Sequence, residues 1–288
     1  VLDFLDQKID IAIIEISSFQ IEASSGLESE IGILLNIEED HIDRHKSFEI
    51  YKSLKLRVLQ ESNINISKLE NKIVGKEFYD YEDYFPESHI LNNPTLKKLP
   101  MHDVFNLKAS LLALKLILEQ KANLKISDVN DFLDKAIEVF APFKKQPHRF
   151  EVLEKVNDIT YVNDSKATNF DATLKSIESS RNLNKEGNIY LICGGDLKEQ
   201  DLSKESAVIF KEIEKCFIYG KDKDLLKELL SYFTNCVSCA DLDSAYSLAK
   251  EESGIGDLVL LSPACSSTDM FKDYRERGLR FKELVKRS

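Results

Sequence analysis

Two short segments combine charged and hydroxyl side chains at a density that suits binding of a charged small molecule. His148 and Arg149 follow a proline break, and the planar guanidinium of Arg149 could grip a phosphate with paired donors. Asp164, Lys166 and Thr168 follow an apolar run and supply an acid, an amine and a hydroxyl. An interdomain salt bridge is the alternative for Arg149. Helix capping is the alternative for the second segment, although a cap would need only one of those groups.

Two residues in the first half of the chain could serve phosphate transfer. Glu15 ends an apolar run, and a carboxylate fixed at a strand end can hold Mg²⁺ beside phosphates. His41 lies in the polar loop after the next apolar run. A carboxylate bonded to loop amides and a solvated histidine are the simpler interpretations of each alone, so their shared place at neighbouring strand ends is what favours a metal site. Lys55 lies on a predicted helix, and neither its type nor its spacing marks it.

The second half of the chain alternates strand-like and helical segments. Such alternation predicts a doubly wound parallel sheet, in which ligands bind at the carboxyl ends of the strands. A Gly194-Gly195 turn, with Lys198 just beyond it, follows one of these strands, and a serine-rich loop that includes Ser267 follows the last. The predicted strands are 159–163, 188–193, 216–219, 236–239 and 258–261.

The secondary-structure patterns in the first half of the chain are weaker. The apolar run Ile9 to Ile16 predicts a strand buried on both faces of a parallel sheet, and Ile31 to Ile37 predicts a second strand. A helix is expected from Phe48 to Gln60, and weak strands and loops from 63 to 100. Asp103 and Ser127 are expected to cap helices that run to Leu118 and Phe140.

The length of 288 residues predicts two domains. Pro142 and Pro147 interrupt the chain, so the boundary is placed near Lys145, giving domains 1–145 and 146–288. Only eight residues precede the first predicted strand, with no start signal, and we therefore expect that an N-terminal region is missing from this sequence.

The composition favours a soluble globular protein that acts on small molecules. Hydrophobic residues make up 43% of the chain and charged residues 31%, and the net charge of −11 opposes nucleic-acid binding. The sequence contains no membrane span or signal peptide, so a cytoplasmic location is expected. The five cysteines are interpreted as reduced packing thiols, in preference to a zinc site or a redox motif at Cys236 and Cys239.

Seven ordered motifs resemble those of the Mur ligase family, and among its branches the one that adds D-glutamate. They begin at Glu15 (EISSFQIE), Leu34 (LLNIEEDHIDRH), Tyr51 (YKSLK), His148 (HRFE), Asn163 (NDSKATN), Cys193 (CGGDLKEQD) and Leu260 (LLSPACSSTDMF). The resemblance spans nearly the whole chain and is weakest between 62 and 100. NDSKATN and SPACSSTDMF discriminate between branches that add different amino acids.

This resemblance implies an α/β fold: the remainder of a P-loop-type central ATPase domain, followed by a Rossmann-like, doubly wound C-terminal domain. The family's phosphate loop, of the form G-x-x-G-K-[ST], is absent from the sequence and is expected upstream of residue 1. For that reason the isolated chain is expected to be inactive. The resemblance also implies a monomer.

Site roles follow from the resemblance residue by residue. Glu15, His41 and Lys55 match ligands of two Mg²⁺ ions, with Lys55 carbamylated, and a carbamate would replace a cation with an anionic oxygen ligand. ATP contacts are matched by Asn106, Arg149 and Asp164, with His148 beside them. The D-glutamate region is matched by Lys166, Thr168, Lys198, Ser267 and Tyr274. Catalytic roles are expected for Lys55, His41 and Lys166.

The implied reaction joins UDP-N-acetylmuramoyl-L-alanine to D-glutamate at the expense of ATP, through an acyl phosphate, in peptidoglycan synthesis. One departure from the family pattern is His102-Asp103, where an acid replaces an ATP-contacting amide. A folylpolyglutamate synthase-like ligase is the alternative within the superfamily. A noncatalytic fragment that only binds D-glutamate is the alternative from another class, and an oxidoreductase is disfavoured because no G-x-G-x-x-G follows a strand.

Overall fold

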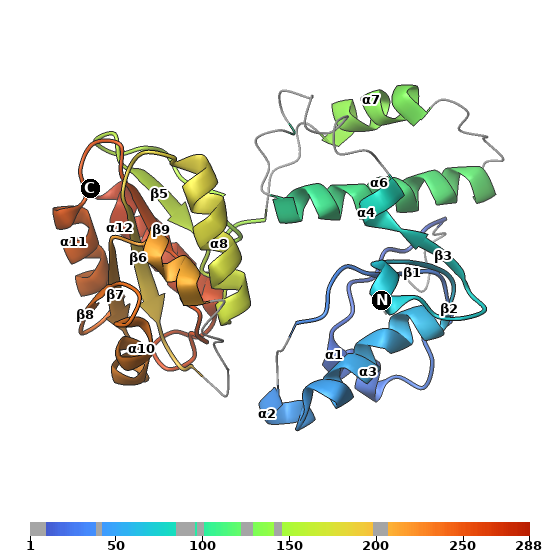
Figure 1. Ribbon diagram of the computed structural model, residues 1–288, viewed down its shortest axis with the longest axis horizontal. Helices are drawn as coiled ribbons and strands as arrows, with labels where there is room; N and C mark the ends of the chain where they lie inside the picture. Colours follow the sequence, from blue (N-terminus) through green and yellow to red (C-terminus); the bar gives the residue numbers. More distant parts are fainter. Residues whose placement is uncertain are drawn as a thin grey trace. The chain divides into compact units, whose positions relative to one another are not determined.

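The computed structural model describes residues 10–38, 42–84, 96, 101–121, 129–140, 146–197 and 207–288. These residues fall into two compact units (Figure 1). The first is drawn from the described parts of 1–37, 45–87 and 105–126, and the second from those of 38–44, 88–104 and 127–288. None of the described helices has the length and apolar character needed to span a membrane.

The first unit contains a three-stranded parallel sheet with the order β1-β2-β3. The strands are β1 (Ser29–Leu34), β2 (Ser62–Ser67) and β3 (Glu77–Asp80). The described helices up to residue 121 are α1 (Ser18–Ala23), α2 (Ile42–His45), α3 (Phe48–Gln60), the 3₁₀ turn η2 (Leu69–Asn71), α4 (Tyr81–Tyr84) and α6 (Met101–Lys121).

Helix α3 has the predicted bounds because local signals define both of its ends. The Ser47 side chain accepts a hydrogen bond from the backbone N–H of Ile50 at 3.3 Å, which caps the first turn. At the other end Arg57 pairs with Glu61 four residues later, at 2.5 Å. The predicted strand at 31–37 is also confirmed, displaced by two or three residues, as β1.

The strand predicted at Ile9 to Ile16 is wrong. Residues 11–17 have no regular secondary structure, and the Ile13 side chain is 93% exposed. A strand buried on both faces needs neighbouring strands and covering layers. In the described part of the chain β1 pairs only with β2, so this apolar run has no partner.

Helix α6 begins at Met101, so Asp103 lies inside its first turn and is not the cap that the sequence predicts. An acid in the first turn still interacts favourably with the helix dipole, which explains why the sequence signal resembles a cap. Helix α7 (Val129–Phe140) ends at the predicted residue, and Ser127 lies outside the described residues.

The second unit contains a six-stranded sheet with the order β4-β5-β9-β6-β7-β8. All neighbouring strands are parallel except β4, which runs antiparallel to β5. The strands are β4 (Glu151–Val152), β5 (Thr160–Asn163), β6 (Ile189–Gly194), β7 (Lys215–Tyr219), β8 (Asn235–Ser238) and β9 (Leu258–Leu261). This sheet confirms the predicted doubly wound fold, and β4 is the strand that the sequence did not predict.

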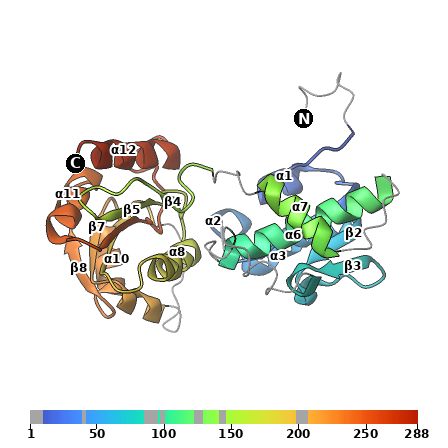
Figure 2. The ribbon, with the colours of Figure 1, turned by 90° about the horizontal axis from the view of Figure 1, so that it is seen from above.

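Both faces of this sheet are covered, because its strands are apolar on both sides. Helix α8 (Phe170–Leu183), the 3₁₀ turn η4 (Val208–Glu212) and α10 (Lys223–Leu230) pack on one face, through Ile177, Phe210 and Leu226. Helices α11 (Leu242–Glu252) and α12 (Tyr274–Lys286) pack on the other, through Tyr246 and Phe281. Figure 2 shows α8 and α12 on opposite sides of the strands.

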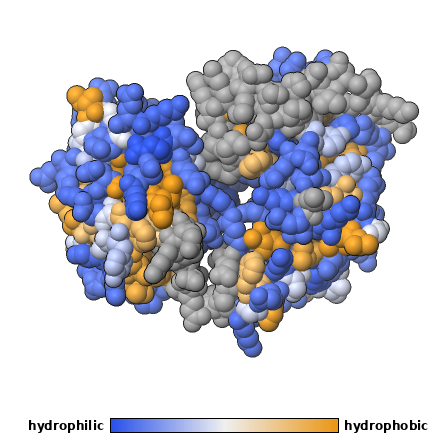
Figure 3. Space-filling view, viewed as in Figure 1, coloured by the Kyte–Doolittle hydropathy of each residue, from blue (hydrophilic) through white to orange (hydrophobic). Residues whose placement is uncertain are grey.

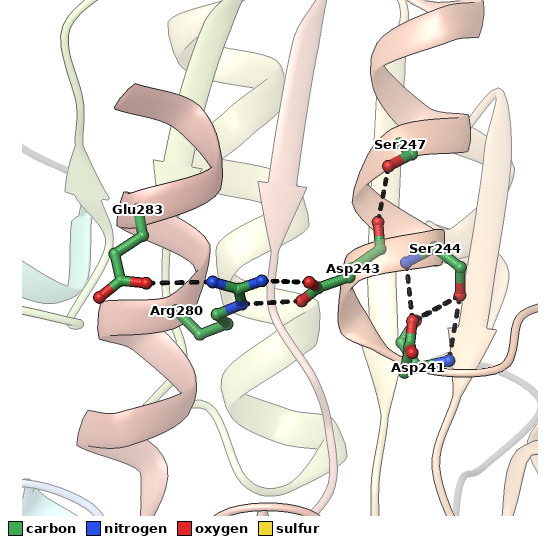
Figure 4. A network of polar contacts seen from close by, with 6 residues as sticks. All are labelled: Asp241, Asp243, Ser244, Ser247, Arg280 and Glu283. Atoms are coloured by element: carbon green, nitrogen blue, oxygen red, sulfur yellow. Dashed lines mark hydrogen bonds and ion pairs between the residues drawn. The ribbon is translucent and has the colours of Figure 1, made fainter. Parts of the chain in front are cut away.

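Helices α11 and α12 are also joined by ion pairs at the surface (Figure 4). The Nε and Nη2 groups of Arg280 donate to the two carboxylate oxygens of Asp243, and Nη1 reaches the carboxylate of Glu283 at 3.1 Å. Asp241 and Ser244 form a capping box at the start of α11. The coloured surface in Figure 3 is mainly hydrophilic, with separate hydrophobic areas.

The loops after three strands meet at the carboxyl edge of the second unit's sheet. The backbone N–H of Asp164, after β5, donates to the carbonyl of Leu261 at 2.8 Å, and Gly194 N–H, at the end of β6, donates to Pro263 at 2.9 Å. Asp196 and Ser266 form an isolated antiparallel bridge. The polar clusters after β5, β6 and β9 are therefore held together, as the sequence predicts.

Candidate active site

The turn that carries His148 and Arg149 is tied through its backbone to the loop after β5. His148 and Phe150 adopt left-handed backbone angles, φ +69° and +44°. The N–H of Phe150 donates to the Asp164 carboxylate at 2.9 Å, and the N–H of Lys166 donates to the carbonyl of His148 at 3.0 Å. These bonds hold the two motifs at a fixed spacing.

Asp164 therefore has a clear structural role. Its side chain is buried, and its second oxygen accepts a hydrogen bond from the Ser176 hydroxyl on α8. Arg149, by contrast, is exposed. Of the two ATP contacts expected here, the arginine is thus the one whose charge faces solvent, while the aspartate positions the turn that bears it.

Tyr274 gathers three of the charged or aromatic side chains of this region. The ammonium of Lys166 lies 4.4 Å from the centroid of its ring, and the Arg275 guanidinium carbon lies 5.0 Å from it. The ring of His148 approaches edge-on, with 6.3 Å between centroids. Tyr274 is the first residue of α12, whose N-terminus is capped by the side chain of Asp273. Thr168, two residues after Lys166, is half-buried.

The glycine turn after β6 is closely packed on its neighbours. Gly195 has φ +135°, and a Cβ built on it would lie 2.1 Å from the carbonyl oxygen of Ser266. Glycine is the residue that tolerates both the angle and the contact. Ser267 is buried beside this turn, and its carbonyl accepts hydrogen bonds from Met270 and Phe271. Lys198 lies outside the described residues.

Arg277, which the sequence analysis did not single out, joins these three loops from inside the protein. It is fully buried, and its guanidinium donates to both the hydroxyl and the carbonyl of Ser165, at 3.0 and 2.8 Å. It also donates to the carbonyls of Cys265 at 3.1 Å and Gly194 at 3.4 Å. One side chain thus connects the ends of β5 and β6 and the loop after β9.

Two titratable groups of the site have shifted pKa values. Burial lowers the pKa of His148, so its imidazole is neutral near pH 7. Burial alone would raise the pKa of Glu151, but the ammonium of Lys282 and the N–H of His148 both bond to the carboxylate and lower it. The site thus contains a neutral histidine beside a charged carboxylate.

The residues expected to serve metal and nucleotide in the first half of the chain are only partly described. Glu15 and Asn106 are exposed, and the ammonium of Lys55 lies 5.8 Å from the centroid of the Tyr51 ring. His41 lies outside the described residues. Within the described part of the chain, no cluster of three or more His, Cys, Asp or Glu side chains could hold a metal ion. The metal site remains a prediction.

Comparison with known proteins assigns the family. A family model described as "Mur ligase middle domain" matches residues 1–80, and one described as "Mur ligase, glutamate ligase domain" matches residues 148–265. The chain is 30% identical over 299 residues to a protein of Francisella philomiragia subsp. philomiragia named UDP-N-acetylmuramoylalanine–D-glutamate ligase. It is 31% identical over 289 residues to the protein of that name from Francisella tularensis subsp. novicida. The chain belongs to the Mur ligase family.

The match covers 99% of this chain and 66% of each of those relatives, so the chain spans just under two thirds of their length. Solved structures of the same fold include MurF ligase from Thermotoga maritima in complex with ADP, with a TM-score of 0.56 and 17% identity over 90% of this chain and 63% of that one. Escherichia coli FolC in complex with ADP has a TM-score of 0.59 and 16% identity, over 91% of this chain and 63% of that one. These neighbours confirm the expected fold.

Proposed function

We propose that this chain provides the amino-acid-binding domain and part of the ATPase domain of a ligase that adds D-glutamate to UDP-N-acetylmuramoyl-L-alanine. The observation that carries the proposal is the placement of the Lys166 ammonium over the Tyr274 ring, beside the loop after β9 that contains Ser267 and that Arg277 joins to the loop after β5. Lys166 and Ser267 lie within the two motifs that discriminate between branches of the family, and Tyr274 follows the second motif by three residues. The names of the curated relatives support the same substrate pair.

The proposed reaction has two steps. The carboxylate of UDP-N-acetylmuramoyl-L-alanine attacks the γ-phosphorus of ATP, releasing ADP and forming an acyl phosphate. The amine of D-glutamate then attacks the acyl carbon, and inorganic phosphate leaves as the amide forms. In such chemistry the protein acts mainly by positioning its substrates and neutralising charge.

The side chains of the second unit suit a dicarboxylate substrate. The ammonium of Lys166 is held over the Tyr274 ring, and a cation so placed can pair with a carboxylate. Ser267, Thr168 and Lys198 are proposed as further contacts. Arg149, exposed at the turn after the proline break, is proposed to contact ATP phosphate, with His148 and Asn106 near the nucleotide and Asp164 holding the turn.

Glu15, His41 and Lys55 are proposed to hold two Mg²⁺ ions. The exposed carboxylate of Glu15 is an oxygen donor of the kind that Mg²⁺ prefers. Lys55 fits only as a carbamate, because a free ammonium such as the one that now faces the Tyr51 ring would repel the ion. When bound, the ions would neutralise charge on the transferring phosphoryl group. We further propose a domain boundary near residue 145, a monomeric state and a cytoplasmic location.

Release of ADP by a protein that carries this chain together with its family's phosphate loop tests the proposal. Turnover should require UDP-N-acetylmuramoyl-L-alanine and D-glutamate together, and L-glutamate should not replace D-glutamate. Lys166→Ala should raise the KM for D-glutamate by at least tenfold, whereas Lys155→Ala, a substitution outside the motifs, should not. Turnover with a folate and L-glutamate would instead support the folylpolyglutamate synthase-like alternative.

Assays of the 288-residue chain by itself test the remaining alternative, a noncatalytic fragment that only binds D-glutamate. We expect it to release no ADP, because the phosphate loop motif is not in its sequence. D-glutamate binding by the chain, measured by isothermal titration calorimetry, together with inactivity of the longer protein would support a noncatalytic binding role. ATP turnover by the 288-residue chain would contradict our expectation.

A further inference from the structure

The amide of Asn163, the last residue of β5, lies at the centre of a buried group of polar atoms. Its nitrogen Nδ2 is 3.0 Å from Nδ1 of His148 and 3.2 Å from the backbone carbonyl oxygen of Gly278. The same nitrogen is 3.4 Å from the carboxylate of Glu151. Its oxygen Oδ1 accepts a hydrogen bond from the backbone N–H of Ser165 at 3.3 Å. Asn163 is fully buried, and His148 is only 6% exposed.

These contacts identify which of the two amide atoms of Asn163 is the nitrogen Nδ2 and which is the oxygen Oδ1. The Gly278 carbonyl can only accept a hydrogen bond, and the Ser165 N–H can only donate one. If the amide were rotated by half a turn, Oδ1 would face the Gly278 carbonyl and the Glu151 carboxylate, and Nδ2 would face an N–H. Each of those contacts would be repulsive in a buried setting, so the orientation with Nδ2 toward His148 is the stable one.

The orientation of the amide in turn decides the protonation of the imidazole. An amide N–H₂ only donates, so Nδ1 of His148 must accept and therefore bears a lone pair. The ring's proton is then on Nε2. We propose that Asn163 is a positioning residue, which holds His148 as the neutral tautomer protonated at Nε2 and so maintains a hydrogen-bond donor, not a cation, at the ligand end of the sheet.

The charges that face this ring do not reverse that assignment. Glu151 on β4 favours an imidazolium, whereas Lys282 and Arg275 on α12 oppose it. The Glu151 carboxylate is already bonded to the Lys282 ammonium and to the backbone N–H of His148. Burial is the largest influence on the pKa of His148 and lowers it. The imidazole also lies edge-on against the Tyr274 ring, and the ammonium of Lys166 lies over that ring, a further cation that does not favour an imidazolium.

A neutral donor has a specific use in the proposed ligase. His148 precedes Arg149, the proposed phosphate contact. Because the imidazole is held neutral, its Nε2–H would remain available to an oxygen acceptor over the whole physiological pH range. A histidine that titrated near pH 6.5 would change its charge in that range. This role rests on the proposed function, whereas the tautomer assignment does not.

Long-range ¹H–¹⁵N correlation spectra of the histidine-labelled 288-residue chain test the assignment directly. The chain has five histidines, and His148→Gln identifies the signals of His148 by their loss. We expect the wild-type chain at pH 7 to show an unprotonated Nδ1 and a protonated Nε2. A protonated Nδ1, or an imidazolium, would overturn the proposal without any variant.

Asn163→Asp supplies the complementary test, because a carboxylate at this place accepts a hydrogen bond and favours a protonated Nδ1. We expect His148 to be an imidazolium at pH 7 in this variant, with its titration midpoint raised by more than one pH unit. Asn169→Asp is the matched control: it adds the same charge in the same loop, at a helix cap where aspartate accepts the Ala172 N–H equally well. An unshifted midpoint in a folded Asn163→Asp variant would count against the proposal.

Kinetics then separate this proposal from the proposed function. In the longer, active protein, Asn163→Asp should introduce a new pH dependence of kcat/KM between about pH 6 and 8, the range in which histidine charge changes become visible. If the wild-type protein shows no ligase activity, the proposed function fails while the spectra still decide the tautomer. If the spectra show the expected shift but the pH profile of kcat/KM does not change, the donor role fails.

Discussion

The imidazole of His148 occupies the space that a side chain at residue 278 would need. A Cβ built on Gly278 would lie 2.2 Å from Nδ1 of that ring and within 3 Å of two further ring atoms. Both residues are buried. The start of α12 and the turn that bears His148 can therefore pack together only with glycine at this position.

Gly278→Ala should consequently destabilise the second unit by about 1–3 kcal/mol, the usual cost of an overpacked core. Urea denaturation of the wild type and the variant measures this difference. The control is a double-mutant cycle with His148→Ala, which removes the ring. In that background Gly278→Ala should cost much less. Equal costs in the two backgrounds would show that the ring is not what excludes the methyl group.

Arg277→Met should destabilise the protein by about 3 kcal/mol or more, because several buried carbonyls and a hydroxyl would lose their donors. Arg277→Lys should also be destabilising, since an ammonium cannot reach all of these acceptors at once. Arg275→Met, at the exposed neighbour on the same helix, is the matched control and should have a far smaller effect on the midpoint of urea denaturation. Equal losses for Arg277 and Arg275 would contradict the bridging role.

The cysteines should differ in reactivity. A hydrogen bond from Cys216 lowers the pKa of Cys236, which is half-buried, whereas burial raises the pKa of Cys216 and Cys265. Iodoacetamide under native conditions should therefore label Cys236 first, because the thiolate is the reactive form. Peptide mass spectrometry gives the order, and full labelling of all five cysteines in denaturant is the control. Early labelling of Cys216 would contradict the described packing.

Stability should fall as pH decreases from 7.5 to 5.5. The folded-state pKa of His148 is lowered, so the unfolded chain takes up a proton near pH 6.5 while the folded protein does not. Each pH unit below that point then costs up to about 1.4 kcal/mol until the folded pKa is reached. Urea denaturation at pH 7.5, 6.5 and 5.5 measures the slope, and His148→Gln should flatten it. The lowered pKa of Glu151 adds a further loss at lower pH, below the range of this experiment.

The sheet of the second unit could be predicted from the sequence because its strands are continuous apolar runs separated by helical segments. Leu258–Leu261 has the predicted bounds. The two-residue strand β4 could not be predicted, because Glu151–Val152 is too short to show any periodicity. At Ile9 to Ile16 the sequence predicts a strand that is not formed. Apolar composition indicates a preference for burial, but whether a neighbouring strand is present to pair with depends on the fold.

The candidate site was predictable where it depends on the ends of parallel strands. Asp164, Gly195 and Ser267 follow three different strands, and the rule that such ends share one edge brings their loops together. Arg277 was not predictable, since an arginine among Arg275, Glu276 and Arg280 has the pattern of a solvated helix face. Only the packing of α12 over the loops buries it. The orientation of the Asn163 amide likewise depends on a contact with the Gly278 carbonyl, 115 positions along the chain.

The order of the strands has a consequence for biosynthesis. Strand β9 is the last of the described strands in sequence, yet it lies between β5 and β6, which do not pair with each other. During translation the earlier strands of this sheet therefore form two separate pieces, and both wait for residues 258–261 to emerge. Arg277 follows later still and bonds to the ends of both pieces. A nascent chain of this protein would thus leave the apolar edges of β5 and β6 unpaired until β9 has emerged, and unpaired strand edges of this kind favour aggregation.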